Sequence, residues 1–250
     1  MLVAERKVLL LTRLHDEGKV VARELAGELG ISEDSIRRDL RDLAAAGQCQ
    51  RVYGGAVPVS RALADYRSRA TVEPESKRRI AARAVRLIKP GDRVILDGGT
   101  TTLAVTRALP PDLRATVVTH SPTIAAALID HPAIEILLLG GRIYKHSAVA
   151  CGAAAAEAAR AITADLFLLG VTGVHDQHGL TTGDAEEAAM KRTLAGQAAD
   201  TYVLASSEKI GAVSPYKVLE LDAAAAILTD AQGDALAALR RKGPAIIECE

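Results

Sequence analysis

The sequence predicts an α/β protein in two parts: a small, mostly helical head followed by a doubly wound, mostly parallel sheet. In the first 57 residues, short helical patterns separated by glycines precede a pair of short strands. After residue 75, short apolar strands alternate with helices, which is typical of a parallel sheet buried on both faces. We therefore expect a head at 1–57, a linker at 58–74 and a larger domain at 75–250.

The head begins with three helical segments. An apolar helix ends before Gly18, a second helix spans 21–29, and a third follows Ser32 and runs to Ala46. Gly30 can adopt the positive φ that ends a helix, and Ser32 is a natural N-cap for the next one. The pattern predicts two helices joined by a tight turn.

The third helix carries a charged face opposite an apolar one. Ile36, Leu40 and Leu43 fall within one narrow arc at about 100° per residue, so they face the core. Arginines lie on the opposite face, where guanidinium groups can bond guanine edges or phosphates if the helix enters a major groove. A solvated charged face on a small helical bundle is the alternative.

A short wing follows the third helix at the expected distance and favours a winged helix-turn-helix over a plain bundle. Polar and apolar residues alternate from Arg51 to Tyr53, and Gly54-Gly55 permits a tight hairpin close to a DNA backbone. The expected partner is double-stranded operator DNA. The DNA contacts we expect come from Ser32, Asp34, Ser35, Arg37, Arg38, Arg41, Arg51, Tyr53 and Gly54.

The charge of the head argues for more than one copy on DNA. Residues 1–57 hold nine lysines and arginines against nine aspartates and glutamates, so their net charge is zero. A nucleic-acid-binding domain usually has a basic footprint. Affinity must then come from charge placement and from two heads bound together, so we expect a homodimer or homotetramer held by the larger domain.

Composition excludes several other classes of protein. No stretch of 18 apolar residues occurs and no apolar signal core opens the chain, so we expect a cytoplasmic protein with no membrane partner. The three cysteines are far apart and the histidines lack paired spacing, so we expect no metal. Aromatic residues make up only 2% of the chain, which disfavours the stacking platforms of single-strand and RNA modules.

The linker loses regular periodicity and gathers Arg61, Arg67 and Arg69. It either lies near DNA phosphates or is an ordinary polar connector. A helix is expected from Glu75 to Ile88, with Lys77, Arg78 and Arg79 turned outward, and Pro90-Gly91 ends it.

In the larger domain, strands and helices alternate. The expected strands lie at 93–96, 115–118, 134–139, 166–169, 202–205 and 226–228. One expected helix ends at 109, and three others span 123–129, 153–162 and 185–198. A fold of this kind binds ligands at the carboxyl ends of its strands.

The loops at those strand ends are polar and rich in glycine. The segment 97–102 places two glycines and three threonines before a helix, whose free amides favour an anion such as a phosphate monoester. A turn that merely caps a helix would look the same. Three further loops follow other strands, which favours a ligand site built from Asp97, Gly99, Thr100, Thr101, Thr102, Thr119, His120, Ser121, Gly141, Arg142, Thr172 and Gly173.

The whole chain resembles the DeoR family of bacterial sugar-metabolism regulators. The matching segments are 29–40 and 51–57 in the head, and 77–81, 96–102, 117–121, 138–142, 170–179, 187–192 and Lys209 with Gly211 in the larger domain. The resemblance implies a ligand domain similar to ribose-5-phosphate isomerase, in which a phosphorylated sugar binds over the strand ends and releases the heads. It also adds Lys191 and Lys209 to the expected effector contacts.

The chain departs from the family pattern at two places. His120 stands where the family usually has Asn, and Ser206-Ser207-Glu208-Lys209 stands where an AspSerSerLys run is common. The identity of the effector therefore cannot be carried over. His120 is expected to be either a pH-sensitive ligand contact or a spacer.

The function we expect is a repressor of carbohydrate-metabolism genes, relieved by a phosphorylated sugar, with no catalytic residues and no cofactor. The alternative is a sugar-phosphate isomerase-like enzyme with an appended DNA-binding head. Isomerisation needs paired carboxylates, and the loop 172–176 lacks the acidic cluster that the isomerase family carries there. A DNA-binding head on a scaffold that binds no ligand is a third possibility.

Overall fold

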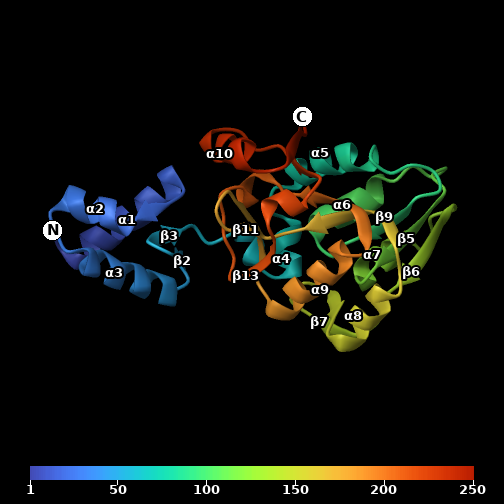
Figure 1. The fold of residues 1–250 in the computed structure, drawn as a ribbon, viewed down its shortest axis with the longest axis horizontal. Helices are drawn as coiled ribbons and strands as arrows, with labels where there is room; N and C mark the ends of the chain where they lie inside the picture. Colours follow the sequence, from blue (N-terminus) through green and yellow to red (C-terminus); the bar gives the residue numbers. More distant parts are fainter.

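The computed structural model describes residues 1–250, apart from the side chains of His15, Asp16, Arg61 and Lys242. A small head and a larger body are joined by an extended segment (Figure 1). The head has its own cluster of buried apolar side chains, separate from the two clusters that lie in the body. The two parts are therefore packed independently.

The head is a winged helix-turn-helix. Its elements are α1 (Val3–Glu17), β1 (Val20–Val21), α2 (Ala22–Leu29), α3 (Glu33–Ala45), β2 (Gln50–Val52) and β3 (Gly55–Val57). Leu10, Leu25, Ile36 and Leu40 are buried between the three helices. The strands pair in the order β1-β3-β2, so β1, which the sequence pattern did not predict, fixes the wing to the start of α2.

Glycine is required where the wing crosses β1. A Cβ atom on Gly55 would lie 1.8 Å from the carbonyl oxygen of Val20, so no other residue fits there. Gly54 has a φ of +81°, in the left-handed region that favours glycine. These two residues turn the hairpin and leave Tyr53 at its tip fully exposed.

The body is built on a seven-stranded parallel sheet in the order β15-β14-β12-β9-β4-β5-β6. Its strands are β4 (Arg93–Leu96), β5 (Ala115–Thr119), β6 (Ile134–Leu138), β9 (Ala164–Gly170), β12 (Ala198–Leu204), β14 (Ala226–Thr229) and β15 (Ala245–Glu248). All of the predicted strands are present, and β9 and β12 are longer than expected.

Helices cover both faces of this sheet. The helices are α5 (Pro74–Val85), α6 (Thr100–Ala108), α7 (Pro122–Leu128), α8 (Ala153–Arg160), α9 (Ala185–Ala195) and α10 (Asp234–Lys242). Figure 1 shows α5 and α6 on one side and α8 and α9 on the other. Successive strand residues alternate between the two cores: Ile95 packs with α8 and α9, whereas Val94 and Leu96 pack with α5, α6 and α7.

The order of the strands creates a switch point between β4 and β9. From β4 the chain proceeds through β5 to β6 on one side, and from β9 through β12 to β15 on the other. Ligand crevices in open parallel sheets form where the strand order reverses in this way. The loops after β4 and β9 therefore flank the natural binding crevice of the fold.

Several short elements were not predicted from the sequence. They are the hairpin β7 (Arg142–Tyr144) with β8 (Val149–Cys151), the sheet of β10 (Gly173–His175), β11 (Gly179–Thr182) and β13 (Tyr216–Leu219), the single turns η2 (Ser207–Lys209) and η3 (Leu221–Ala223), and α10 with β15. Strands of three or four residues are too short to show a reliable alternation of polar and apolar residues.

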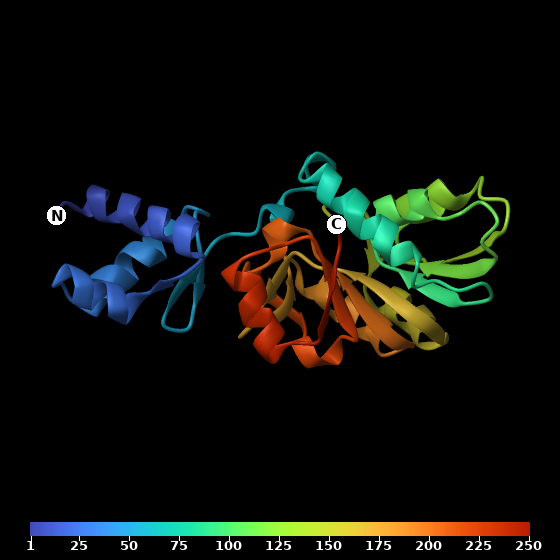
Figure 2. The same ribbon diagram turned by 90° about the horizontal axis from the view of Figure 1, so that it is seen from above.

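The linker is folded onto the body and is not a free connector. It forms a single turn η1 (Arg61–Leu63) and a short helix α4 (Tyr66–Ala70). Figure 2 shows an extended stretch between head and body, after which the chain lies along the body. Arg67 is exposed, Arg69 points into the body, and the side chain of Arg61 lies outside the described residues.

In the part of the chain that the structure describes, no helix is both long and apolar enough to span a bilayer.

Candidate functional site

The exposed face of α3 presents three arginines. Arg37, Arg38 and Arg41 are all exposed, whereas Ile36 and Leu40 on the opposite face are buried. Ser32 caps the helix, since its hydroxyl accepts a hydrogen bond from the Ser35 amide at 3.3 Å. The other expected DNA contacts, Asp34, Arg51, Tyr53 and Gly54, lie on the start of this helix or on the wing, and Asp34, Arg51 and Tyr53 are exposed.

Counter-charges explain how a head without net charge presents a basic face. Arg6 on α1 forms an ion pair with Asp39, which is only 2% exposed, and Lys7 pairs with Asp42 at 2.7 Å. Asp39 and Asp42, two of the acids on α3, are therefore neutralised by side chains of α1. Among the arginines of α3, Arg37 is held by Glu33 at 2.7 Å, one helical turn earlier.

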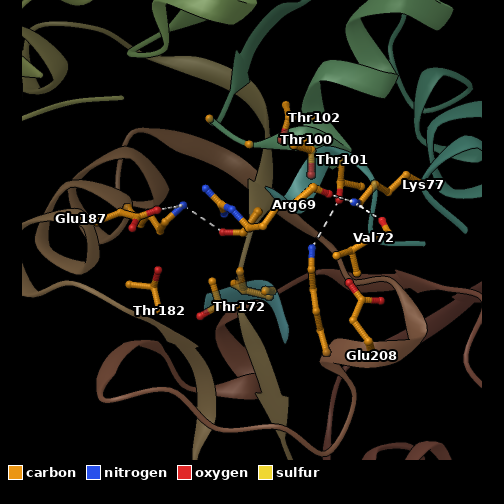
Figure 3. A pocket seen from close by; sticks show the side chains of 17 residues that line it. Arg69, Val72, Lys77, Thr100, Thr101, Thr102, Thr172, Thr182, Glu187 and Glu208 are labelled. Atoms are coloured by element: carbon orange, nitrogen blue, oxygen red, sulfur yellow. Dashed lines mark hydrogen bonds and ion pairs between the residues drawn. The ribbon is translucent and has the colours of Figure 1, made fainter. Parts of the chain in front are cut away.

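The principal pocket of the body lies at the switch point between β4 and β9. Figure 3 shows side chains converging on it from several elements. Its lining residues are Ala62, Arg69, Val72, Lys77, Gly98, Gly99, Thr100, Thr101, Thr102, Gly170, Val171, Thr172, Thr182, Glu187, Lys191, Glu208 and Lys209. The linker, α5, the loops after β4 and β9, α9 and the turn η2 all contribute.

Seven of the expected effector contacts line this pocket: Gly99, Thr100, Thr101, Thr102, Thr172, Lys191 and Lys209. Gly99, with a φ of +123°, precedes the first turn of α6, where the three threonines stand. Lys209 reaches from η2 toward the same turn, and its ammonium lies 3.3 Å from the Thr101 hydroxyl. A helix N-terminus, hydroxyls and an ammonium thus meet in one place.

The pocket is strongly cationic. Burial lowers the pKa of Lys209 to about 8, and the nearby Lys77, Arg69 and Lys191 act in the same direction, while Glu208 opposes them. Burial likewise lowers the pKa of Lys77 and of Arg69. Cations held in this way are stabilised when an anion enters.

A buried carboxylate holds the floor of the pocket together. Asp97, which is fully buried, accepts hydrogen bonds from the amides of Gly98 and Gly170, each at 2.8 Å, and from the Lys191 ammonium. Burial opposes the ionisation of Asp97, but Lys191 and His120 outweigh it, so its pKa is lowered to about 2. Lys191 also pairs with Glu187 at 3.2 Å, and its pKa is raised because these carboxylates outweigh the effect of burial.

His120 belongs to this network and not to the pocket wall. Its Nδ1 lies 2.8 Å from the carbonyl oxygen of Ala150, and its Nε2 lies 2.9 Å from the Asp97 carboxylate. Both partners are hydrogen-bond acceptors, so the imidazole ring is held in place through both of its nitrogens.

The remaining expected contacts lie outside the lining of this pocket. Four of them are fully buried: Asp97, Thr119, His120 and Ser121. Two glycines, Gly141 and Gly173, pack closely against other segments of the same chain. Arg142 is exposed and forms an ion pair with Glu186. For residues 119–121, 141 and 142 the cause is strand order, because β5 and β6 lie one and two strands away from β4, on the side of β4 opposite β9. Asp97 follows β4 itself, but its carboxylate is turned toward the backbone of the loops after β4 and β9.

Four charged residues of the pocket were missed by the sequence prediction: Arg69, Lys77, Glu187 and Glu208. Lys77 was expected to point outward, yet it is only 4% exposed, and its ammonium donates to the carbonyl oxygens of Arg69 and Val72. Its position three, four and seven residues before Ile80, Ala81 and Ala84 already placed it on the buried face. The sequence gives no comparable signal for Arg69, which belongs to the aperiodic linker.

Some buried polar atoms of the pocket lack a hydrogen-bond partner. Among the described side chains, four buried polar atoms lack a hydrogen-bond partner: Nε of Arg69, the hydroxyls of Thr102 and Thr182, and Oε2 of Glu208. All four residues line this pocket. Because buried polar groups are nearly always hydrogen-bonded, these atoms are places where water or a polar ligand can bind.

The pocket is almost filled by its own walls. Its free space is about 20 Å³, enough for a water molecule and far less than a sugar phosphate requires. Linker residues Ala62, Arg69 and Val72 form part of its lining. A ligand of sugar size therefore needs part of this wall to move.

The cysteines of the described chain are all unpaired with one another. Cys49, Cys151 and Cys249 are free and buried, and burial raises their pKa values, to about 12 for Cys151 and about 11 for Cys249. The described residues contain no cluster of three or more histidine, cysteine, aspartate or glutamate side chains that could hold a metal ion.

Comparison with protein families matches both parts of the chain. Residues 6–62 match the DeoR-like helix-turn-helix domain, and residues 72–231 match the DeoR C terminal sensor domain.

Relatives of known name are similar over nearly their whole length. The chain is 34% identical to the HTH-type transcriptional repressor GlcR of Bacillus subtilis, covering 90% of this chain and 88% of the relative. It is 34% identical to the HTH-type transcriptional regulator GlpR of Haloferax volcanii, covering 94% and 92%. A putative aga operon transcriptional repressor of Escherichia coli O157:H7 is 29% identical, covering 98% and 93%.

Among solved structures, ribose 5-phosphate isomerase A of Methanocaldococcus jannaschii matches 54% of each chain at 18% identity with a TM-score of 0.41. A translation initiation factor eIF-2B of Pyrococcus horikoshii matches 54% of this chain and 47% of its own at 20% identity with a TM-score of 0.39.

Replacing Asp97 with Asn tests the buried network. We expect the free energy of unfolding at pH 7 to fall by about 3–5 kcal/mol, because the substitution removes the buried anion that pairs with Lys191 and contacts His120. The folded pKa of Asp97 is depressed, so its contribution is present above about pH 4 and is lost as the pH falls toward 2. Urea denaturation followed by circular dichroism from pH 7 to 2 measures both effects.

The matched control is Asp200→Asn, at an exposed carboxylate on β12 of the same sheet. It should change stability by less than about 0.5 kcal/mol. Equal stability of the two variants across the pH range would remove Asp97 from the role assigned to it.

Proposed function

Because the chain belongs to the DeoR family of helix-turn-helix transcriptional regulators, we propose that it represses carbohydrate-metabolism genes and that a phosphorylated sugar relieves its operator binding. The names of several relatives support the repressor role, since they include a GlcR repressor and an aga operon repressor. The observation that carries the proposal is a cationic pocket at the switch point of the sheet, walled in part by the linker to the DNA-binding head.

The head supplies the DNA contacts. Arg38 and Arg41 of α3 are exposed and have no ion pair among the described residues, so they are available to base edges in a major groove. Arg37, steadied by Glu33, and Arg51 on the wing are placed to meet phosphates. Tyr53 and Gly54 at the wing tip approach the DNA backbone.

The pocket supplies the effector site. The phosphate binds at the first turn of α6, where free amides and the hydroxyls of Thr100 and Thr101 face it, and Lys209 provides the charge. The sugar hydroxyls meet Thr102, Thr172 and Thr182. This arrangement suits an anion with several hydroxyl groups better than an inorganic ion alone.

The linker connects effector binding with DNA release. Val59 pairs with Val213, the Ser60 hydroxyl donates to the carbonyl oxygen of Thr172, and the Tyr66 amide donates to the carbonyl oxygen of His146 at 2.9 Å. The same segment contributes Ala62, Arg69 and Val72 to the pocket wall. A sugar phosphate does not fit until this wall moves, so binding displaces the segment that positions the head.

In this scheme the docked linker marks the state that binds the operator, and the displaced linker marks the state that holds the effector. The effector then lowers operator affinity by as much as it prefers the displaced state. We assign residues 1–57 to DNA binding, 58–74 to the linker and 75–250 to effector binding and oligomerisation.

We further propose that the protein acts as a homodimer or homotetramer. The head has no net charge, so a single copy lacks the electrostatic attraction that usually drives DNA binding. Two heads joined through their bodies bind two half-sites together.

Replacing Arg38 with Ala tests the DNA face. We expect operator binding to weaken by about 1–3 kcal/mol if Arg38 reads a guanine, with the fold intact because the side chain is exposed. Fluorescence anisotropy with labelled DNA from upstream of the chain's own operon measures the loss. The control is Arg107→Ala, an exposed arginine on α6. Unchanged operator affinity in the Arg38 variant would exclude this helix from the interface.

The pH dependence of effector binding tests Lys209. Its pKa of about 8 means that its charge is lost as the pH rises through 8, and a bound anion favours the charged form. Sugar phosphates are already dianions above pH 7. We therefore expect affinity to fall by up to about tenfold per pH unit above pH 8, and Lys209→Met to flatten this profile.

This measurement uses calorimetry on the tightest binder from a panel of pentose and hexose monophosphates. Lys217→Met, at an exposed lysine of β13, serves as the control and should keep the wild-type profile. If no member of the panel binds, or if Lys209→Met binds as the wild type does at every pH, the effector site is misplaced.

A disulfide between positions 59 and 213 tests the linker. Val59 and Val213 are neighbours in a parallel bridge, so their Cα atoms lie about 5 Å apart, within disulfide range. The doubly substituted Val59→Cys, Val213→Cys protein should, when oxidised, bind operator DNA with or without sugar phosphate. Reduction of the same sample should restore release. Full release in the oxidised form would contradict coupling through this segment.

A further inference from the structure

Glu208 is one of two carboxylates in a pocket that is also lined by four cations, and, unlike Glu187, it forms no ion pair among the described residues. It stands on η2 directly before Lys209 and lines the pocket beside Val72 (Figure 3). It opposes the lowering of the pKa of both Lys209 and Lys77, so it lies close to both cations. A carboxylate in an anion site either balances the neighbouring cations or meets a donor group of the ligand.

The two oxygens of Glu208 are in different situations. Oε1 accepts a hydrogen bond from the Ser206 hydroxyl at 2.7 Å, which fixes the orientation of the carboxylate. Oε2 is buried and lacks a hydrogen-bond partner among the described side chains. The carboxylate is therefore held in place with one oxygen free.

The free oxygen specifies the chemistry of its partner. A carboxylate accepts hydrogen bonds and donates none, so Oε2 needs a hydroxyl or an amine. The Lys77 ammonium bonds two carbonyl oxygens and the Lys209 ammonium faces Thr101, and neither is bonded to Oε2. A hydroxyl or an amine of the ligand can supply the donor.

We propose that Glu208 determines effector specificity by accepting a hydrogen bond from a hydroxyl or amine of a sugar monophosphate and by excluding ligands that bring a second anionic group to that position. This inference rests on the proposed effector site and adds the class of ligand. The anionic end meets Lys209 and Thr101, and the donor end meets Glu208. A bisphosphate or an anion without donors leaves Oε2 unpaired or repelled.

The test compares three kinds of ligand on the full-length protein by calorimetry at pH 7.5. The panel of monophosphates, including fructose 6-phosphate, offers hydroxyl donors. Sulfate is a dianion without any donor, and fructose 1,6-bisphosphate brings a second phosphate. The variants are Glu208→Gln, which removes the charge but keeps the shape, and Glu208→Ala, which removes the acceptor; Glu157→Gln, at an exposed carboxylate on α8, is the control.

In the wild type we expect the tightest monophosphate to bind at least about 10- to 100-fold more tightly than sulfate, and fructose 6-phosphate to bind more tightly than fructose 1,6-bisphosphate. In Glu208→Gln the preference for the tightest monophosphate over sulfate should fall about tenfold, because sulfate gains affinity and the sugar monophosphate loses affinity. Glu208→Ala should show a larger fall, and Glu157→Gln should match the wild type.

Two outcomes would overturn the inference: an unchanged ratio of monophosphate to sulfate in both Glu208 variants, or wild-type protein that binds fructose 1,6-bisphosphate as tightly as fructose 6-phosphate. Lys209→Met separates this failure from that of the effector site. If Lys209→Met loses anion binding while the Glu208 variants keep the wild-type ratio, only the specificity role fails. If Lys209→Met binds every probe as the wild type does, the effector site itself is wrong.

Discussion

The ionised carboxylate of Asp97 is the interaction on which the pocket depends. It bonds the backbone of the loops after β4 and β9, the ammonium of Lys191 on α9 and the ring of His120 after β5. Four segments that are distant in sequence are thus tied to one buried anion. Burying a charge is costly unless it is paired, and here the pairing fixes the two loops that flank the switch point.

Charge in this network is balanced within a few residues. Asp97 and Glu187 carry the negative charges, Lys191 carries the positive charge that pairs with both of them, and His120 holds the Asp97 carboxylate from the other side. The cations that face the cavity, Lys209 and Arg69, are left outside this balance. Charges are balanced in the head in the same way: Arg6 and Lys7 on α1 neutralise acids of α3, and the arginines of α3 stay exposed. Net charge, which is zero in both the head and the whole chain, conceals both surfaces.

The sequence predicts the parts of this molecule that depend on periodicity and misses those that depend on tertiary contacts. The parallel strands and the helices of the head were predictable because apolar spacing and glycines mark them. Expected effector contacts after β4 and β9 lie together in one pocket. Residues 119–121 and Arg142 do not line it, because the order of strands, which no local pattern encodes, places them elsewhere.

Arg69 and Lys77 show two kinds of failure. Lys77 lies on the buried side of α5 by simple helical spacing, but its charge suggested exposure, and only the carbonyl oxygens offered by the linker make its burial tolerable. Arg69 sits on a five-residue helix within an aperiodic stretch, and its place in the wall follows from how that stretch docks on the body. A single amino-acid sequence does not show how the linker docks on the body.

The small free volume of the pocket has a consequence for the speed of the response. With room for little more than a water molecule, the closed wall does not admit the proposed sugar phosphate, so in the proposed scheme ligand enters only molecules whose wall has already opened. At low concentration the rate of association is then the encounter rate scaled by the open fraction. At high concentration it reaches a ceiling set by the opening step, so additional metabolite does not hasten the switch.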